Sequence, residues 1–221
     1  MNRYFLIGET HGTKECPQEF FKFVIKNKIG KVALEFLKDN QKDIDKFYSR
    51  AIGVNEISFF KNKENTHDGR ASDAVKNLIS GLRKEKIRIF LVDEEAKSAY
   101  ERDKLMAKNL SNIEGKVAFL CGEVHASKKP MQLEKSSEFY KYYPKGEVKT
   151  CGYFLNKTEK VISIKIHAIN GGKFYNFSVK GYPKDKGLSK KISPSNLPKI
   201  IKSNEDSFDY LCLTDKFSYS K

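Results

Sequence analysis

Short apolar runs alternate with amphipathic stretches along the first half of this chain. Each run is short enough for a buried strand, and the stretches between the runs place apolar residues on one side of a helix. Strands are predicted at residues 3–7, 31–36, 87–92 and 116–121, and helices at 17–28, 39–51, 70–84 and 96–110. Because such alternation is typical of βα units, we predict an α/β fold with a mainly parallel central sheet flanked by helices.

The second half of the chain has a different pattern. Residues 146–154, 160–169 and 173–180 are consecutive β-rich runs with polar turns, which predicts an antiparallel β-rich extension of the sheet. Residues 184–198 are rich in Lys, Ser and Pro and should form a surface loop, followed by a last strand at 208–214. At 221 residues, the chain fits one domain over 1–221, with 127–202 as a basic extension of it.

The charge of the chain is strongly positive but unevenly placed. There are 42 Lys and Arg against 28 Asp and Glu, a net charge of +14. Residues 127–202 carry 17 Lys and no Arg against 5 acidic residues. Because Arg is favoured over Lys for planar recognition of phosphates and base edges, we expect no nucleic-acid partner beyond weak, salt-sensitive binding without sequence preference.

Composition also limits the compartment and the covalent chemistry. No apolar run approaches the roughly 18–20 residues that span a bilayer, and Glu9 interrupts the first apolar run too early for a signal peptide. We therefore expect a cytoplasmic protein with no membrane contact. The four Cys residues show no spacing typical of a zinc site or a disulfide framework, so reduced thiols are expected.

Two copies of a Gly-Glu-x-His tetrad follow directly after predicted strands. They are Gly8-Glu9-Thr10-His11 and Gly122-Glu123-Val124-His125. Functional groups of parallel sheets collect beyond the carboxyl ends of the strands, and both tetrads fall there. Taken singly, each His would be a buried turn residue and each Glu a helix-start carboxylate. Because the pattern recurs at matching positions, we predict that His11 and His125 lie close together in one polar site.

Other polar residues are candidates for the same site. Glu35 ends an apolar strand, where a carboxylate must be paired or placed in a pocket. His67, Asp68 and Arg70 precede a predicted helix, where Asp68 alternatively caps the helix and His67 is exposed.

A further candidate pair lies in the predicted helix at 96–110. Arg102 and Asp103 belong to a charged cluster that is solvated in the ordinary case, whereas in a site Arg102 would clamp a carboxylate. His167 lies within a β-rich run and is expected to be structural.

These motifs together resemble a known superfamily. The segments GETHG, ALEF, ERDKLMAKNL, CGEVHA and FDYLCLTDKF are similar, in this order, to the erythromycin-esterase-like and ChaN-like superfamily, which is distantly similar to TraB/Tiki-type proteins. The resemblance implies an α/β fold in which the two histidine loops meet over the sheet, and esterase relatives use the first-motif His with nearby carboxylates to activate water. It places Glu9, His11, Glu35, Arg102, Asp103 and His125 in motif positions. Glu123 departs from the Asn common in relatives, and its charge favours a cation in the site.

The leading hypothesis is a hydrolase that acts on an ester, amide or similar bond of a small-molecule or peptide substrate. His11 is the preferred general base, Glu9 or Glu35 orients it, and His125 binds the electrophile. Ala in place of His11 or Glu35 is expected to leave the fold intact. A metal-assisted version would place Zn²⁺, Mn²⁺ or Fe²⁺ on ligands from His11, His125, Glu9, Glu35 and Glu123. The alternative is a haem- or metal-binding module without catalysis.

Overall fold

A computed structural model describes residues 2–62, 66–135 and 146–220. The alternating pattern of the first half is confirmed, because every predicted strand and helix of that half is present within a few residues of its predicted bounds. The strands are β1 (Arg3–Glu9), β2 (Lys31–Leu37), β3 (Arg88–Asp93) and β4 (Lys116–Gly122). The helices are α1 (Glu15–Lys26), α2 (Gln41–Tyr48), α4 (Asp73–Lys84) and α5 (Ala99–Ser111).

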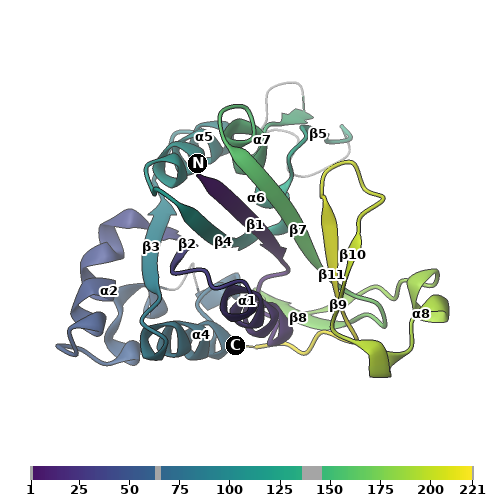
Figure 1. Cartoon of the computed structure of the whole chain (residues 1–221), viewed down its shortest axis with the longest axis horizontal. Coiled ribbons are helices and arrows are strands. Elements are labelled where there is room, and N and C mark those ends of the chain that lie inside the picture. Colours follow the sequence, from purple (N-terminus) through teal and green to yellow (C-terminus); the bar gives the residue numbers. More distant parts are fainter. Residues whose placement is uncertain (1, 63–65, 136–145, 221) are drawn as a thin grey trace.

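The central sheet has seven strands in the order β10-β11-β7-β1-β4-β2-β3. Its later strands are β7 (Lys160–Ala168), β10 (Lys199–Lys202) and β11 (Tyr210–Thr214). Neighbouring strands pair in parallel except β10 and β11, which are antiparallel. The predicted α/β class is therefore confirmed, and the sheet runs through the middle of the molecule with helices around it (Figure 1).

The second half differs in detail from the predicted meander. Residues 146–154 form the short strand β6 (Glu147–Val148) and the helix α7 (Cys151–Leu155). This helix forms because the Thr150 side chain accepts a hydrogen bond from the Tyr153 N–H at 3.1 Å and so caps the first turn. β7 is not an antiparallel extension, since it lies between β1 and β11 and is parallel to both.

The antiparallel part is a separate hairpin of β8 (Gly172–Asn176) and β9 (Ser178–Tyr182). A second small antiparallel pair joins β5 (Met131–Gln132) to β6. The predicted surface loop at 184–198 contains one turn of helix, α8 (Leu188–Lys191), and a short 3-10 turn at Pro194–Asn196. The extension is thus divided between an inner strand, a hairpin and an edge strand.

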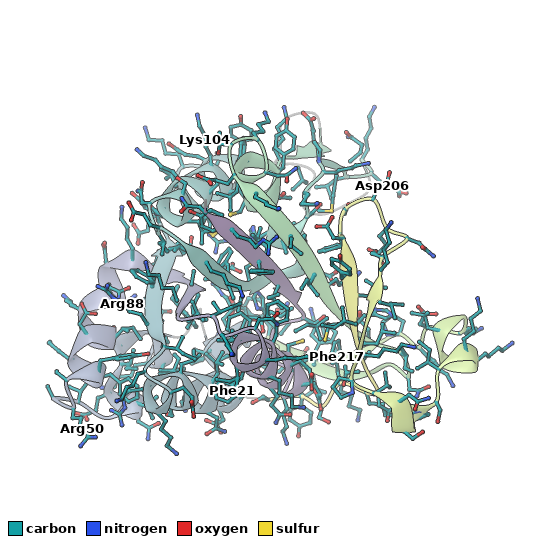
Figure 2. The ribbon with its side chains drawn as sticks, in the orientation of Figure 1. Phe21, Arg50, Arg88, Lys104, Asp206 and Phe217 are labelled. Carbon is teal, nitrogen blue, oxygen red and sulfur yellow. The ribbon has the colours of Figure 1, made fainter. Side chains whose placement is uncertain are left out.

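The apolar core has one layer on each face of the sheet. Alternate side chains of a strand point to opposite faces, so Phe5 and Ile7 of β1 pack with α1, α2 and α4, whereas Tyr4 and Leu6 pack with α5 and α7. Charged side chains such as Arg50, Lys104 and Asp206 lie at the outside of the molecule (Figure 2). Of the helices within the described ranges, none is long and apolar enough to cross a membrane.

The hairpin is attached to the loop after β1 through Gly12. The Gly12 backbone has φ of +69°, and a Cβ built there would overlap the carbonyl oxygen of Tyr175 in β8. The Tyr175 N–H donates to the Gly12 carbonyl at 3.1 Å, and the Ser220 N–H donates to the same oxygen at 2.8 Å. Gly12 is therefore the point at which three segments of the chain come together.

We expect Gly12→Ala to lower the free energy of unfolding by more than about 1 kcal/mol, because the left-handed backbone strains an L residue and the methyl group overlaps the hairpin. Gly30→Ala is the matched control, since a Cβ at Gly30 meets nothing within 4 Å. Urea unfolding of both variants measures the difference. Equal stability of the two variants would contradict the close approach of β8 to this loop.

Candidate functional site

A row of polar groups crosses the sheet near the carboxyl ends of its parallel strands, from β7 to the edge strand β3. Following the order of the sheet, they are Lys165 on β7, Glu9 on β1, the Gly122 N–H on β4, Glu35 on β2 and Asp93 on β3. Glu9 and Gly122 are register partners, as are Gly8 and Lys165. The two tetrads therefore follow adjacent strands at one edge of the sheet, and their histidines meet over it.

Glu35 is the centre of this arrangement. Its side chain is 5 % exposed, its Oε2 accepts from the Gly122 N–H at 2.8 Å, and its Oε1 accepts from Arg102 Nη2 at 2.8 Å. His125 Nε2 lies 3.5 Å from Oε1, and His11 Nε2 lies 3.8 Å from Oε2. Burial opposes the charge, but His125, Arg102, His11 and Arg70 outweigh it and hold the pKa of the Glu35 carboxyl well below its usual range.

Each histidine is held by a second carboxylate. His11 Nδ1 lies 2.9 Å from Glu9 Oε1, and His125 Nδ1 lies 2.7 Å from Asp103 Oδ1. An ionised carboxylate only accepts hydrogen bonds, so Nδ1 of each ring carries the proton and Nε2 faces Glu35. The two side chains are 19 % and 14 % exposed, which leaves both rings reachable from solvent.

The carboxylates raise the pKa of both imidazoles. Burial disfavours the charged ring of His11, but the hydrogen bond to Glu9 and the charges of Glu9 and Glu35 raise its pKa above the usual value. For His125, burial is likewise outweighed by the charges of Glu35 and Asp103 and by the hydrogen bond to Asp103, so its pKa is also raised. Each imidazole therefore stays protonated to a higher pH than a free histidine does, and each can take up and release a proton.

These shifts predict how stability depends on pH. A group whose pKa is raised on folding stabilises the protein fully below its unfolded pKa, near 6.5, and loses that contribution as pH rises through the folded value. We expect the melting temperature to fall as pH rises above about 6.5, and to fall less in a double variant with His11→Asn and His125→Asn. Melts at constant ionic strength measure this. An unchanged slope in the double variant would contradict the raised pKa values.

Two arginines bridge the acidic groups around Glu35. Arg102 binds Asp93 through two bonds, from Nε to Oδ1 at 2.8 Å and from Nη2 to Oδ2 at 2.5 Å. Arg70 Nη1 lies 3.5 Å from Glu35 and 3.6 Å from Asp93, while its Nε donates to Asp68 at 2.7 Å. The predicted clamp by Arg102 is thus present, and Arg70 is a second cation beside the same carboxylates.

The other candidates lie at different distances from this network. Asp68 binds Arg70 and does not cap α4, whose N-cap is Ser72. His67 is exposed, and its ring lies 6.2 Å from the ring of Phe177 in the hairpin, beyond the Glu35 contacts. Glu123 faces Lys165, with Oε2 at 3.6 Å from Nζ, and makes no ion pair with the residues around Glu35 that the structure describes.

Sequence reasoning missed Asp93 and Lys165 as site residues. Asp93 ends β3 and is 5 % exposed, so its position after an apolar run was the signal that could have identified it. Lys165 gave no signal, because it is one of many lysines in the second half of the chain. Its side chain is only 17 % exposed and lies near both Glu123 and Glu205.

The candidate metal ligands do not converge on one point. In the described parts of the chain, no group of three or more His, Cys, Asp or Glu side chains is arranged to hold a metal ion. The oxygens of Glu35 are taken by Arg102 and the Gly122 N–H, and Glu123 faces Lys165 instead. The residues in this arrangement therefore do not fit a resident cation.

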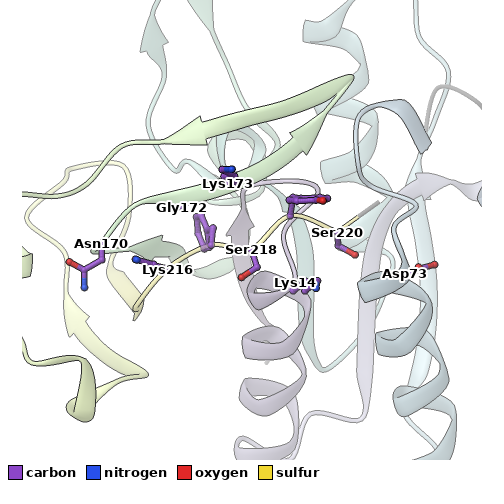
Figure 3. Close-up of a pocket in the computed structure, with 10 residues that line it drawn as sticks. Lys14, Asp73, Asn170, Gly172, Lys173, Lys216, Ser218 and Ser220 are labelled. Carbon is purple, nitrogen blue, oxygen red and sulfur yellow. The ribbon is translucent and has the colours of Figure 1, made fainter.

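A broad hollow of about 920 Å³ lies on another part of the surface and is lined by none of the residues around Glu35. Lys14, Lys173 and Ser218 are among its lining residues (Figure 3).

A Cβ on Gly122 would come within 3.0 Å of His11 Nε2, so the backbone of the second tetrad lies directly against the first imidazole. The candidate site is therefore a partly exposed rim of packed polar groups.

Comparisons with known proteins agree with this architecture. No protein-family model matches the chain, and no curated protein matches its sequence. Among solved structures, a mutant of erythromycin esterase EreC in its open conformation superposes with a TM-score of 0.66 and 11% identity, covering 100% of this chain and 92% of that chain. ChaN of Campylobacter jejuni, solved with cofacially bound haem, has a TM-score of 0.52 and 13% identity, covering 94% of this chain and 86% of that one.

The chain has the fold of erythromycin esterase EreC and ChaN. A protein from Bacillus cereus has this EreC/ChaN-like fold as well, with a TM-score of 0.64 and 10% identity over 98% of this chain and 89% of that chain. At these identities the likeness concerns the fold alone, and one EreC/ChaN-like fold serves both an esterase and a haem-binding protein. The fold therefore does not determine the function of this chain, which depends on the residues of its site.

Proposed function

We propose that this chain is a hydrolase that cleaves an ester, amide or similar polar bond with water as the nucleophile. The proposal rests on one observation, that two carboxylate-held imidazoles present Nε2 to opposite oxygens of the same buried Glu35. A pair of imidazoles with raised pKa values supplies a base and an acid in one site when one ring is neutral and the other protonated.

In the proposed reaction, His11 Nε2 takes a proton from water while the water oxygen bonds to the carbonyl carbon. Glu9, bound to Nδ1, stabilises the imidazolium that forms. His125, oriented by Asp103, donates from Nε2 to the carbonyl oxygen, whose charge grows as the tetrahedral intermediate forms. The bond to the leaving group then breaks, and the leaving group receives the proton held by His11.

A covalent nucleophile has little support. The sequence contains no Gly-x-Ser-x-Gly elbow. Cys121 and Cys151 are buried, and burial raises the pKa of both thiols well above the usual range, so neither is a thiolate near neutral pH. Water activated by a histidine is the remaining nucleophile that these residues support.

The second candidate function is haem binding without catalysis, which the similarity to haem-bound ChaN favours. Both proposals are tested by one set of measurements on the purified chain. Turnover is measured on a panel of p-nitrophenyl esters and p-nitroanilides with and without EDTA, and haem binding is measured by absorbance titration. We expect turnover of a small-molecule or peptide substrate. No turnover across the panel, together with tight haem binding, would replace the hydrolase proposal, and loss of turnover in EDTA would establish its metal-assisted version.

A further inference from the structure

The tip of the β8–β9 hairpin carries an exposed aromatic side chain on a strained backbone. Phe177 is 68 % exposed and has φ of +59°. Bulky residues rarely adopt positive φ, and Gly, Asn or Asp normally occupy such turn positions. Neither folding nor turn formation therefore accounts for a phenyl ring at this point, since the ring is not buried and the backbone would prefer another residue.

Backbone hydrogen bonds attach this tip to the loop after β1 and to the segment before α4. The Phe177 N–H donates to the carbonyl of His67, which precedes Asp68 and its partner Arg70. Two residues earlier, the Tyr175 N–H donates to the carbonyl of Gly12, which follows His11. The hairpin tip is thus held beside the polar groups around Glu35 from two directions.

A second exposed apolar side chain follows the first in the same hairpin, two residues later. Val179 in β9 is 47 % exposed, and Val124, between Glu123 and His125 in α6 (Glu123–Ala126), is 39 % exposed. The other large apolar side chains that are exposed in the described ranges are on the outer face of α1, at the β10–β11 edge and in the C-terminal segment: Ile25, Ile200, Tyr210 and Tyr219. Exposed apolar side chains are therefore present on the hairpin that the loop after His11 holds, and at Val124 within the second tetrad.

We propose that Phe177 and Val179 form an apolar lip that binds the acyl chain of the substrate, on the carbonyl side of the bond that is cleaved. The lip determines specificity and takes no part in the chemistry. This inference rests on the proposed hydrolase function, because it names the class of substrate that the same site accepts. Covering the lip with an apolar group removes both side chains from water, whereas a polar substrate would leave them exposed.

The test replaces the ring and keeps the turn. Phe177→Asn removes the apolar surface with a residue that tolerates positive φ, and Val179→Thr makes a nearly isosteric change in a strand. Substrates are p-nitrophenyl acetate and p-nitrophenyl octanoate. We expect Phe177→Asn to lower kcat/KM for the octanoate ester roughly tenfold through KM, with Val179→Thr lowering it less, and both to leave the acetate ester unchanged. Ile200→Thr on β10 is the matched control and should behave as wild type with both esters.

A binding measurement separates the lip from the chemistry. Saturation-transfer NMR with 2-octanone, a ketone that cannot be hydrolysed, reports contact with the lip in wild type and its loss in Phe177→Asn. If 2-octanone binds in a way that depends on Phe177 but no ester is turned over, the proposed lip is supported and the proposed hydrolase function is contradicted. Equal preference for octanoate in wild type and both lip variants, or no binding of 2-octanone by wild type, would overturn the lip. A change of oligomeric state in Phe177→Asn with unchanged KM would also overturn it, in favour of a contact between copies of the chain.

Discussion

His11→Ala is expected to lower the rate of ester hydrolysis by about 10² to 10⁴, the usual effect of removing a general base. The imidazole is partly exposed, its Nδ1 is held by Glu9 and its Nε2 faces Glu35, so its removal takes away the proton acceptor and leaves the apolar core untouched. The rate with p-nitrophenyl acetate at saturating substrate measures the loss. Because the lip does not affect the acetyl ester, this measurement is independent of Phe177.

His167→Gln is the control for this variant. His167 is bound by Tyr182 and Asp185, at 3.0 Å and 3.2 Å, and makes no contact with Glu35 that the described residues record. Its replacement is expected to change the melting temperature and leave the rate constant kcat within about twofold of wild type. His125→Ala should lose activity as His11→Ala does. Wild-type activity in both the His11→Ala and the His125→Ala variants would contradict the proposed mechanism.

Glu35→Ala is expected to lower the free energy of unfolding by about 3 kcal/mol, because breaking a buried ion pair leaves its partners uncompensated. Arg102 and the Gly122 N–H would lose an acceptor, and the two imidazoles would lose the negative charge that they share. This replaces the sequence-based expectation that Ala at Glu35 leaves the fold intact. Activity and stability are therefore lost together at this position.

Urea unfolding of three variants tests this effect. Glu35→Gln keeps the shape and one acceptor, so it should be destabilised less than Glu35→Ala while losing activity equally. Asp206→Ala removes the partner of Lys129 in an exposed ion pair and should unfold as wild type does. If Glu35→Ala unfolds at the same urea concentration as Asp206→Ala, the carboxylate has no structural part in the site.

The first half of the fold was predictable because its strands are short apolar runs with polar ends. Residues 31–36 and 116–121 were placed within one residue of the observed β2 and β4. Residues 146–154 were predicted to be a strand, because Val148, Tyr153 and Phe154 favour a strand by composition. The Thr150 cap and the packing on α5 produce a helix at Cys151–Leu155 instead. Residues 160–168 were correctly assigned to a strand, but composition does not specify which strands lie on either side of it.

The candidate site was predictable to the extent that strand ends determine it. His11 and His125 follow strands that turned out to be adjacent, and Glu35 lies near the carboxyl end of the next strand along the sheet, so the tetrads and the carboxylate meet. The pairing of Asp103 with His125 needs the position of α5 above the sheet, which local sequence does not contain. Lys165 was missed because only the pairing of β7 with β1, which local sequence does not contain either, brings it beside the first tetrad.

The position of β1 has a consequence for synthesis of the chain on the ribosome. Arg3 of this first strand pairs with Lys116 of β4 and Lys160 of β7, so β1 has no strand partner until more than half of the chain has left the exit tunnel. Parallel pairing over such separations is slow, and exposed apolar strands aggregate. During translation, the apolar segment from Tyr4 to Ile7 therefore has no strand on either side of it until β4 and β7 have been made and close around it.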